Sequence, residues 1–448
     1  MRNEKIDWSE VLGQATEYLC QYLQIDTTNP PGNEIMGARF LKEILEREGI
    51  AGTILESEPG RGNLIARLKG KGTKSPLLLL SHIDVVPAEA EQWMYPPFSG
   101  KVVGDEIWGR GAIDCKSLGI SEVMVLILLK RAGVELSRDV ILAATADEEK
   151  GGTNGAAWLC KNRPDFEEIQ TVINEGGGVG VPGKQKNIYF CQVAEKGICW
   201  IRIRLKGSPG HASLPRQDNC LLSLGRCLSR IGEFRARIQV PPVTTRFIEG
   251  FSEDEVLAPI FNRIIQNPDG ADEVLEEIPD RGLKQLVGTM LRTTYVPTVV
   301  KGGEKTNVIP GECLCEVDCR LLPGETPEGV QKEVETILQD IPQCAIEVLD
   351  GSTASESSHR HEILQIFEQA LQRHDPKAKL IPYISSGATD SRFFRKGKAA
   401  AFGFAPVLAE GDLSHYQDLF HGHNERISKQ NLLFGIKVLY EVVRQYCR

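Results

Sequence analysis

Several histidine and acidic residues stand beside apolar, strand-like segments of this chain. Burying such a side chain costs several kcal/mol unless it is paired or bound to a metal ion. Each residue alone is weak evidence, but several of them at strand ends need a common explanation, and a shared metal site is the simplest. The residues are His82, Asp84, Asp114, Glu148, Glu149, Glu175 and His421.

In SHIDVVP, a histidine and an aspartate are separated by one isoleucine. On an extended backbone His82 and Asp84 therefore point to the same side. One can bind a metal ion while the other accepts the second ring N–H, which fixes the tautomer of the histidine. For a lone His-x-Asp, a capped strand end would be the preferred interpretation.

Asp114 lies in the glycine-flanked turn of WGRGAIDCKSLG, just before a helix-like segment. A carboxylate in that place could bridge two cations or cap the helix N-terminus, and both interpretations remain open. In INEGGG, Glu175 follows another strand, and the glycines after it allow the backbone to approach a ligand closely.

ADEEKGG places two glutamates directly after a buried strand. Adjacent side chains diverge, so the two need not share a role. A water molecule activated by a metal ion still needs a group that accepts its proton and returns it to the leaving amine. Glu148 suits that proton shuttle, and Glu149 is then a ligand. HGHNE, near the C-terminus, supplies His421.

The elements that would position these residues alternate between helices and strands. The sequence patterns predict strands within 63–68, 76–84, 139–147 and 171–176, and helices to about residue 23 and over 36–48, 117–131 and 154–161. This alternation predicts an α/β fold with a mostly parallel sheet and helices on both faces. The candidate residues then fall at strand ends, where open α/β sheets bind their ligands.

Around residue 193 the sequence becomes strongly β-patterned, and a helix over 327–339 and a further strand follow. This change predicts a separate α+β layer, within which we interpret the polar, helical segment 241–292 as an insertion. The alternation of helix and strand patterns seen in the first part resumes near residue 351. The expected domains are a catalytic domain of 1–192 and 352–448 and an inserted domain of 193–351.

Composition limits the class of protein. A chain of 448 residues is too long for one ordinary core, and a net charge of −9 argues against a nucleic-acid or lipid-surface binder. The apolar run 123–129 is too short to span a bilayer, and the first residues lack a secretory signal pattern. We therefore expect a cytoplasmic location, with no nucleic-acid partner and no membrane.

The 12 cysteines are scattered through apolar or strand-like segments. Cys313 and Cys315 alternate along a strand, and no second pair completes a zinc-finger pattern. We expect reduced, half-buried thiols and no metal or redox role for them.

Ordered motifs along nearly the whole chain resemble one family, the two-zinc amidohydrolases and exopeptidases. That family includes aminoacylase, acetylornithine deacetylase, succinyl-diaminopimelate desuccinylase, carboxypeptidase G and carnosinase. The motifs are SHIDVVP with W…PPFSG after it, GRGAIDCKSLG, ADEEKGG, INEGGG, GSPGHAS, KTNVIP, DCRLLPG and GATDSR. The resemblance implies a zinc-exopeptidase-like catalytic domain with an inserted lid or dimerisation domain.

The resemblance also implies roles for the candidate residues. Two zinc ions, with cobalt or manganese as alternatives, would be bridged by Asp114, and Glu148 would be the base. His423 competes with His421 for the last ligand position, and His421 fits the family spacing of histidine, two variable residues, asparagine and glutamate. The other ligands are His82 and Glu175 on one ion, and Glu149 beside His421 on the second.

Further motifs imply substrate contacts. In GSPGHAS, His211 resembles the histidine that reaches a neighbouring active site to stabilise the oxyanion, which implies a homodimer. A capped turn is the alternative role for this histidine. Arg320 could hold a substrate carboxylate with two hydrogen bonds. Asn307, Gly387 and Thr389 resemble other substrate-side residues.

Together these features predict a zinc-dependent hydrolase that cleaves an amide bond beside a free carboxylate. The preferred substrate is an N-acyl amino acid, as for a deacetylase or aminoacylase. A carboxypeptidase or dipeptidase acting on short peptides is the alternative, because both activities place a carbonyl on zinc and a carboxylate on arginine. A non-catalytic metal- or peptide-binding scaffold is more remote, since Glu148 would be superfluous in it.

Overall fold

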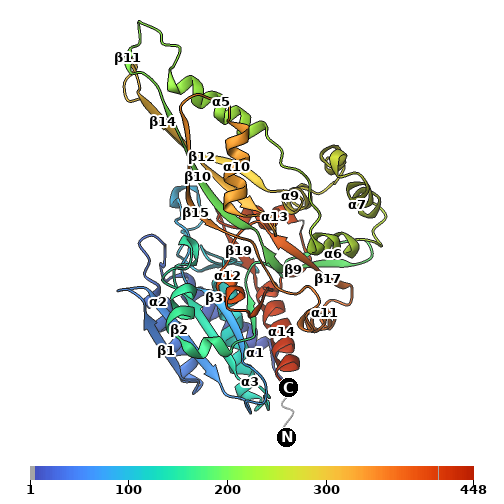
Figure 1. The fold of residues 1–448 in the computed structure, drawn as a ribbon. Coiled ribbons are helices and arrows are strands. Elements are labelled where there is room, and N and C mark those ends of the chain that lie inside the picture. The colour runs from blue at the N-terminus through green and yellow to red at the C-terminus, as the bar shows by residue number, and fades with distance from the viewer. Residues whose placement is uncertain (1–5, 412) are drawn as a thin grey trace.

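The computed structural model describes residues 6–411 and 413–448, which form two parts, each built on a β-sheet (Figure 1). The larger part contains a ten-stranded sheet. Its strands are β1 (Gly52–Glu56), β2 (Gly62–Leu68), β3 (Leu77–His82), β6 (Val140–Thr145), β7 (Thr171–Asn174), β8 (Gly180–Val181), β9 (Asn187–Glu195), β16 (Ser355–Glu356), β17 (Ala378–Ser385) and β18 (Ala400–Gly403).

The centre of this sheet is parallel. β6, β3, β7 and β18 lie next to one another in that order and pair in parallel, whereas β1, β2, β16 and the β18–β9 contact are antiparallel. Both β3 and β6 are buried along their whole length, as expected for strands covered on both faces. The prediction of a mostly parallel sheet is confirmed.

Helices cover both faces of the sheet. One core cluster joins the sheet to α1 (Trp8–Leu23), α2 (Glu34–Arg47), α3 (Lys116–Arg131), α11 (Ile363–Gln372) and α14 (Lys429–Tyr446). A second cluster on the other face includes α4 (Ala156–Asn162) and α12 (Ser391–Lys396). Every residue of α3 from Lys116 to Leu129 is buried, because α1, α2, α14 and the sheet surround it.

The smaller part is an antiparallel sheet in the order β12-β14-β10-β15, with its own apolar core. Its strands are β10 (Gly197–Lys206), β12 (Thr294–Gly302), β14 (Glu312–Leu321) and β15 (Cys344–Ser352). Burial alternates along β10 and β14, so one face packs against helices α5 (Cys220–Glu233) and α10 (Pro327–Ile337). A hairpin of β11 (Gly210–His211) and β13 (Val308–Ile309) forms the tip of this part (Figure 1).

The segment between α5 and β12 contains α6 (Pro242–Gly250), α7 (Leu257–Gln266), α8 (Ala271–Leu275) and α9 (Arg281–Met290). Although it lies between strands of the small sheet in sequence, its apolar residues belong to the core of the large sheet. The ring of Phe247 stacks on Phe190 of β9 with centroids 5.7 Å apart, and α6 packs on β17.

The remaining strands are β4 (Lys101–Val103), β5 (Glu106–Trp108) and β19 (Arg426–Ser428), which form a three-stranded sheet beside the start of α3. The remaining α-helix is α13 (Leu413–Leu419), and short 3-10 helices include Glu148–Lys150. Among the described residues, no helix combines the length and the apolar character that crossing a bilayer requires.

Candidate metal centre

Parallel strands bring the first candidate residues together. His82 is the last residue of β3, Glu148 and Glu149 follow β6, and Glu175 follows β7. Because β6, β3 and β7 are neighbours and parallel, their carboxyl ends lie at one edge of the sheet. The Nε2 atom of His82 is 4.0 Å from a carboxylate oxygen of Glu175.

Asp114 lies between two histidines. Its Oδ1 is 2.9 Å from His82 Nε2, and its Oδ2 is 3.1 Å from His421 Nε2. His421 Nε2 is also 3.2 Å from Glu149 Oε2. The N-cap position of α3 is Cys115, with no side-chain capping bond, so Asp114 does not cap this helix.

The donor atoms fit divalent metal ions. Two groups, one of His82, Glu148 and Glu175 and one of Asp114, Glu149 and His421, each place their donor atoms within 4.8 Å of one another. The second carboxylate oxygen of Glu149 is buried and has no hydrogen-bond partner in the protein. Imidazole and carboxylate are ligands that zinc and similar ions prefer.

The two histidines compensate the negative charge of the acidic side chains only in part. Burial, together with the negative charge of Asp114, raises the pKa of Glu175 to about 8. Burial and the charge of Glu175 raise the pKa of Glu148 well above its ordinary value. Hydrogen bonds to Asp114 and Glu149 raise the pKa of His421 to about 10. A cation in the cluster would supply the missing charge.

Cys115 lies next to the first group but offers a poor ligand. Its Sγ accepts the backbone N–H of His82 at 3.2 Å. Burial raises the pKa of the Cys115 thiol, and only the thiolate binds metal well. All 12 cysteines are free thiols.

The backbone carbonyl of Asp84 orients His82. It lies 2.9 Å from Nδ1, and because a carbonyl only accepts, Nδ1 carries the proton and Nε2 faces the cluster. The Asp84 carboxylate, which we expected in this role, is farther from Nδ1, at 3.6 Å. Instead, it accepts the backbone N–H groups of Glu148 at 3.1 Å and Glu149 at 3.2 Å. It therefore positions both adjacent glutamates.

The structure brings His421, and not His423, to the cluster. His421 follows α13 with a φ of 56°, a left-handed conformation that turns its ring toward Asp114 and Glu149. His423 Nε2 instead lies 3.5 Å from a carboxylate oxygen of Glu89.

Glu425 is a positioning residue that the sequence did not reveal. Its buried carboxylate accepts the backbone N–H groups of Gly111, Ile113 and Asp114 at 2.9, 2.7 and 3.0 Å. It also pairs with the buried Arg110 at 2.8 Å. Glu425 thus holds the turn that presents Asp114. The only sequence signal was its place at the end of HGHNE.

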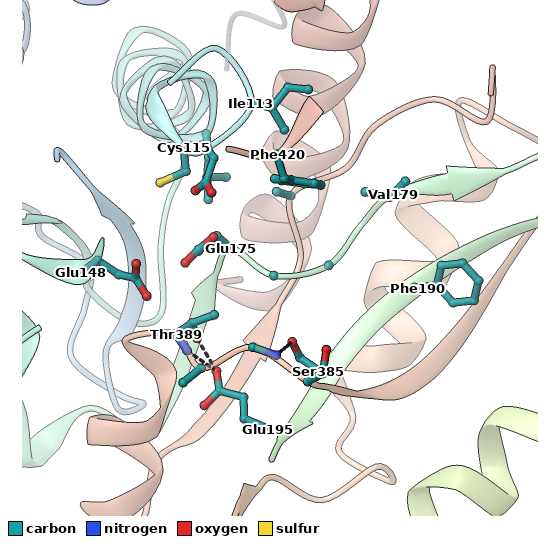
Figure 2. A pocket seen from close by; sticks show the side chains of 18 of the residues that line it. Ile113, Cys115, Glu148, Glu175, Val179, Phe190, Glu195, Ser385, Thr389 and Phe420 are labelled. Carbon is teal, nitrogen blue, oxygen red and sulfur yellow. Dashed lines mark hydrogen bonds between the residues drawn. The ribbon is translucent and has the colours of Figure 1, made fainter. Parts of the chain in front are cut away.

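A cavity of about 1690 Å³ contains the cluster and extends to the small sheet. Arg320, Gly387 and Thr389 line the same cavity. Asp318 holds the Arg320 guanidinium through Nε at 2.7 Å and one terminal nitrogen at 3.0 Å. The backbone N–H of Thr389 donates to buried Glu195 at 3.0 Å, and its hydroxyl donates to the same carboxylate (Figure 2).

His211 and Asn307 do not reach this cavity within one chain. His211 lies on β11, Asn307 lies next to β13, and both are exposed. The backbone N–H of Ala212 donates to the carbonyl of Asn307 at 3.1 Å. Figure 1 shows this hairpin at the tip of the smaller part, far from the large sheet.

An α/β sheet that carries clustered imidazoles and carboxylates at its strand ends, beside a glutamate able to move a proton, is the arrangement of a metal-dependent hydrolase. Residues 78–445 match the model of Peptidase family M20/M25/M40. The chain belongs to this family and is a metal-dependent hydrolase.

Similar proteins agree with this assignment. The human N-fatty-acyl-amino acid synthase/hydrolase PM20D1 is 28% identical over 375 residues, which cover 82% of this chain and 74% of that protein. Aminoacylase-1 of Sus scrofa is 24% identical over 433 residues, covering 94% and 93%. The crystal structure of the metallo-carboxypeptidase Sso-CP2 from Sulfolobus solfataricus shares the fold, with a TM-score of 0.72, 20% identity, and coverage of 98% and 99%.

Proposed function

We propose that the protein is a two-zinc hydrolase of N-acyl amino acids that cleaves the amide bond beside a free carboxylate. The observation that carries this proposal is the single cavity that contains both the ligand cluster and Arg320. A substrate with an amide group and a carboxylate can meet both features at once. Two relatives whose names refer to acylated amino acids support the same substrate class.

The proposed ligands come from the two donor groups, with Asp114 shared between the ions and Glu148 left unbound as the general base. His82 and Glu175 would hold one ion, and Glu149 and His421 the other. When bound, the ions would supply Lewis acidity to the amide carbonyl and to the attacking water. Cobalt or manganese would fit the same ligands.

Glu148 is the proposed general base. Its carboxylate would accept a proton from the attacking water and return it to the leaving amine. The backbone N–H of Glu148 is tied to the Asp84 carboxylate at 3.1 Å, which limits its movement. Burial raises the pKa of Glu148, which makes its carboxylate a stronger proton acceptor.

Arg320 is proposed to bind the substrate carboxylate. Asp318 orients the guanidinium, and a planar guanidinium matches a carboxylate geometrically. Gly387 and Thr389 line the same cavity and would add backbone and hydroxyl contacts. A carboxypeptidase or dipeptidase would use the same contacts, and it remains the alternative activity.

We also propose a homodimer in which His211 and Asn307 act on the cavity of the partner subunit. Their exposure at the hairpin tip supports this, because neither reaches the cavity of its own chain. The edge strand β12 and the adjacent helix α5 carry exposed apolar side chains, which suit an interface. Those side chains are Leu221, Leu222, Val296 and Val300.

The proposed domain division keeps 1–192 and 352–448 as the catalytic domain and 193–351 as the inserted domain. The separate core of the small sheet supports it, while the helices of 242–291 add to the catalytic core. Free thiols throughout the chain support a reducing, cytoplasmic location.

The proposed function can be tested with metal-stripped protein that has been reloaded with zinc, cobalt or manganese. Initial rates are measured on N-acyl amino acids and on a dipeptide panel, with bound metal quantified. The proposal expects higher kcat/KM on N-acyl amino acids and two ions per chain. Activity confined to dipeptides would establish the peptidase alternative and refute the deacylase.

A further inference from the structure

The small sheet contributes part of one face to the wall of the cavity. β10 begins at Gly197, two residues after β9 ends at Glu195, so its first residues adjoin the larger part. Ile198 and Trp200 alternate with the buried Cys199, and both line the cavity. Because Cys199 belongs to the core of the small sheet, Ile198 and Trp200 lie on the opposite face, which is the face turned to the cavity.

Trp200 offers a large apolar surface to the cavity, since its side chain is 44% exposed. The indole N–H donates to Asp318 Oδ2 at 3.3 Å. The one polar group of the side chain is therefore bonded within the protein, and the remainder of the ring system is carbon. A ring with this exposure on a cavity wall favours an apolar or aromatic occupant.

Asp318 joins Trp200 to Arg320. Its Oδ2 accepts both the indole N–H and Nη2 of Arg320, the latter at 3.0 Å, and its Oδ1 accepts Nε at 2.7 Å. The indole and the guanidinium therefore lie side by side. The pairing of β10 with β14 agrees, because Trp200 is directly opposite Asp318. Ile198 is directly opposite Arg320, and opposite residues share one face of a sheet.

The guanidinium of Arg320 keeps one edge for a ligand. Asp318 occupies the edge formed by Nε and Nη2. On the other edge, Nη1 contacts the carbonyl of Ser386 at 3.5 Å, which is long for a hydrogen bond. A carboxylate can bind the Nη1 and Nη2 edge with two hydrogen bonds. Trp200 is the diagonal cross-strand neighbour of Arg320, a separation that an aromatic side chain can span to meet the group next to that carboxylate.

The other neighbour of Trp200 on the sheet is acidic. Asp350 on β15 lies directly opposite Trp200 and also lines the cavity. One of its carboxylate oxygens accepts the N–H of Gly351 at 2.8 Å. A carboxylate in this position repels a negatively charged side chain of a ligand. The apolar surface of Trp200 thus lies between a cation that can hold a carboxylate and an anion that disfavours a second one.

We propose that Trp200 is a specificity-determining residue. Together with Ile198 it would form the subsite for the side chain of the amino acid that carries the free carboxylate, and it would select aromatic side chains. This inference rests on the proposed function, because the carboxylate on Arg320 places the side chain beside the indole. Contact between two aromatic rings adds to the gain from burial. An alanine side chain would leave the indole uncovered, and a glutamate side chain would place its charge near Asp350.

The test uses the full-length, metal-loaded protein and the N-acetyl derivatives of phenylalanine, leucine, alanine, glutamate and lysine, together with the glycyl dipeptides of the same five amino acids. The phenylalanine derivative should have the highest kcat/KM, above that of alanine by about tenfold or more. The glutamate derivative should have the lowest. In Trp200→Ala, the ratio of kcat/KM for phenylalanine to that for alanine should fall by about fivefold or more.

Two further variants separate the ring from its hydrogen bond and from general effects of losing a tryptophan. Trp200→Phe keeps an aromatic ring but loses the N–H donated to Asp318, and it should retain most of the preference. Trp8→Ala removes a tryptophan of α1 that does not line the cavity, and it should leave the ratio unchanged. Thermal unfolding of all three variants checks that they are folded at the assay temperature.

Equal kcat/KM for the phenylalanine and alanine derivatives in the wild-type protein would overturn this inference and leave the deacylase function standing. An unchanged ratio in Trp200→Ala would do the same. If Trp200→Phe loses the preference as fully as Trp200→Ala, the indole acts only through Asp318 and the subsite is refuted. A preference for lysine over phenylalanine would refute aromatic selection and assign the selection to Asp350.

The dipeptides distinguish failure of this inference from failure of the proposed function. Hydrolysis confined to dipeptides, with the same preference at the C-terminal residue, would refute the deacylase and support the subsite. No hydrolysis of any N-acetyl amino acid or dipeptide by metal-loaded protein would overturn both proposals.

Discussion

Glu425 and Asp114 are linked through the backbone: an oxygen of the buried Glu425 carboxylate accepts the N–H of Asp114 at 3.0 Å. The same carboxylate pairs with Arg110, whose side chain is also buried. The position of the central carboxylate of the cluster therefore depends on a residue that touches neither histidine partner of Asp114. The contacts of Glu425 therefore join the segment after α13 to the segment before α3.

Replacing this carboxylate should disturb the metal site at a distance. Glu425→Gln keeps the shape but removes the charge opposite Arg110, and breaking a buried ion pair costs about 3–5 kcal/mol. We expect a lower melting temperature and weaker metal binding, measured by thermal unfolding and by metal titration. Glu106→Gln, which breaks a partly exposed pair with Arg426, is the control and should change both only slightly. Equal metal affinity in both variants would contradict the positioning role.

The convergence of His82, Glu148 and Glu175 was accessible from the sequence because apolar runs identify parallel strands. Once β3, β6 and β7 are recognised as buried and parallel, the residues after them must meet at one edge of the sheet. No atomic detail is needed for that step. The same logic correctly predicted helices on both faces.

Other features depend on tertiary packing that local patterns do not encode. Nothing in the sequence around Glu425 indicates that its carboxylate accepts hydrogen bonds from backbone N–H groups of residues 111–114. The choice between the carbonyl and the carboxylate of Asp84 as partner of His82 depends on distances of 2.9 and 3.6 Å. Likewise, the amphipathic helices of 242–291 could cover either sheet, and tertiary contacts such as that of Phe247 with Phe190 decide which.

Removing the metal ions should abolish activity and lower stability. Without cations, carboxylates such as Asp114, Glu149 and Glu175 crowd together in a buried cluster, where burial raises the pKa of Glu149 and Glu175. Binding at a free metal concentration 100-fold above Kd stabilises the fold by about 2.7 kcal/mol per site. Calorimetric scans before and after chelation, and after zinc is restored, measure this effect. Full activity after exhaustive chelation would refute a metal-dependent mechanism.

Arg320→Ala should weaken recognition of a free carboxylate. Losing a charged hydrogen-bonding partner costs about 1.5–3 kcal/mol, or roughly 10- to 150-fold in kcat/KM. The loss should appear on substrates with a free α-carboxylate and be small on amidated analogues, so kinetics on matched pairs decide the question. Arg202→Ala, on the small sheet and paired with Glu316, is a control outside the cavity lining. Equal losses on both substrate types would show that Arg320 does not bind the carboxylate.

Substitutions at the two adjacent glutamates should distinguish the general base from the metal ligand. Glu148→Gln should keep nearly full metal content and an unchanged fold while kcat falls by about 10²–10⁴-fold, the range for a lost general base. Glu149→Gln should lose metal first, because a neutral amide is a poorer zinc ligand than a carboxylate. Both glutamates lie near possible metal ligands. Glu148 shares a donor group with His82 and Glu175, and Glu149 Oε2 lies 3.2 Å from His421 Nε2. Metal content and kcat are measured on both variants. If Glu148→Gln loses metal while Glu149→Gln stays metallated and inactive, the two roles are reversed.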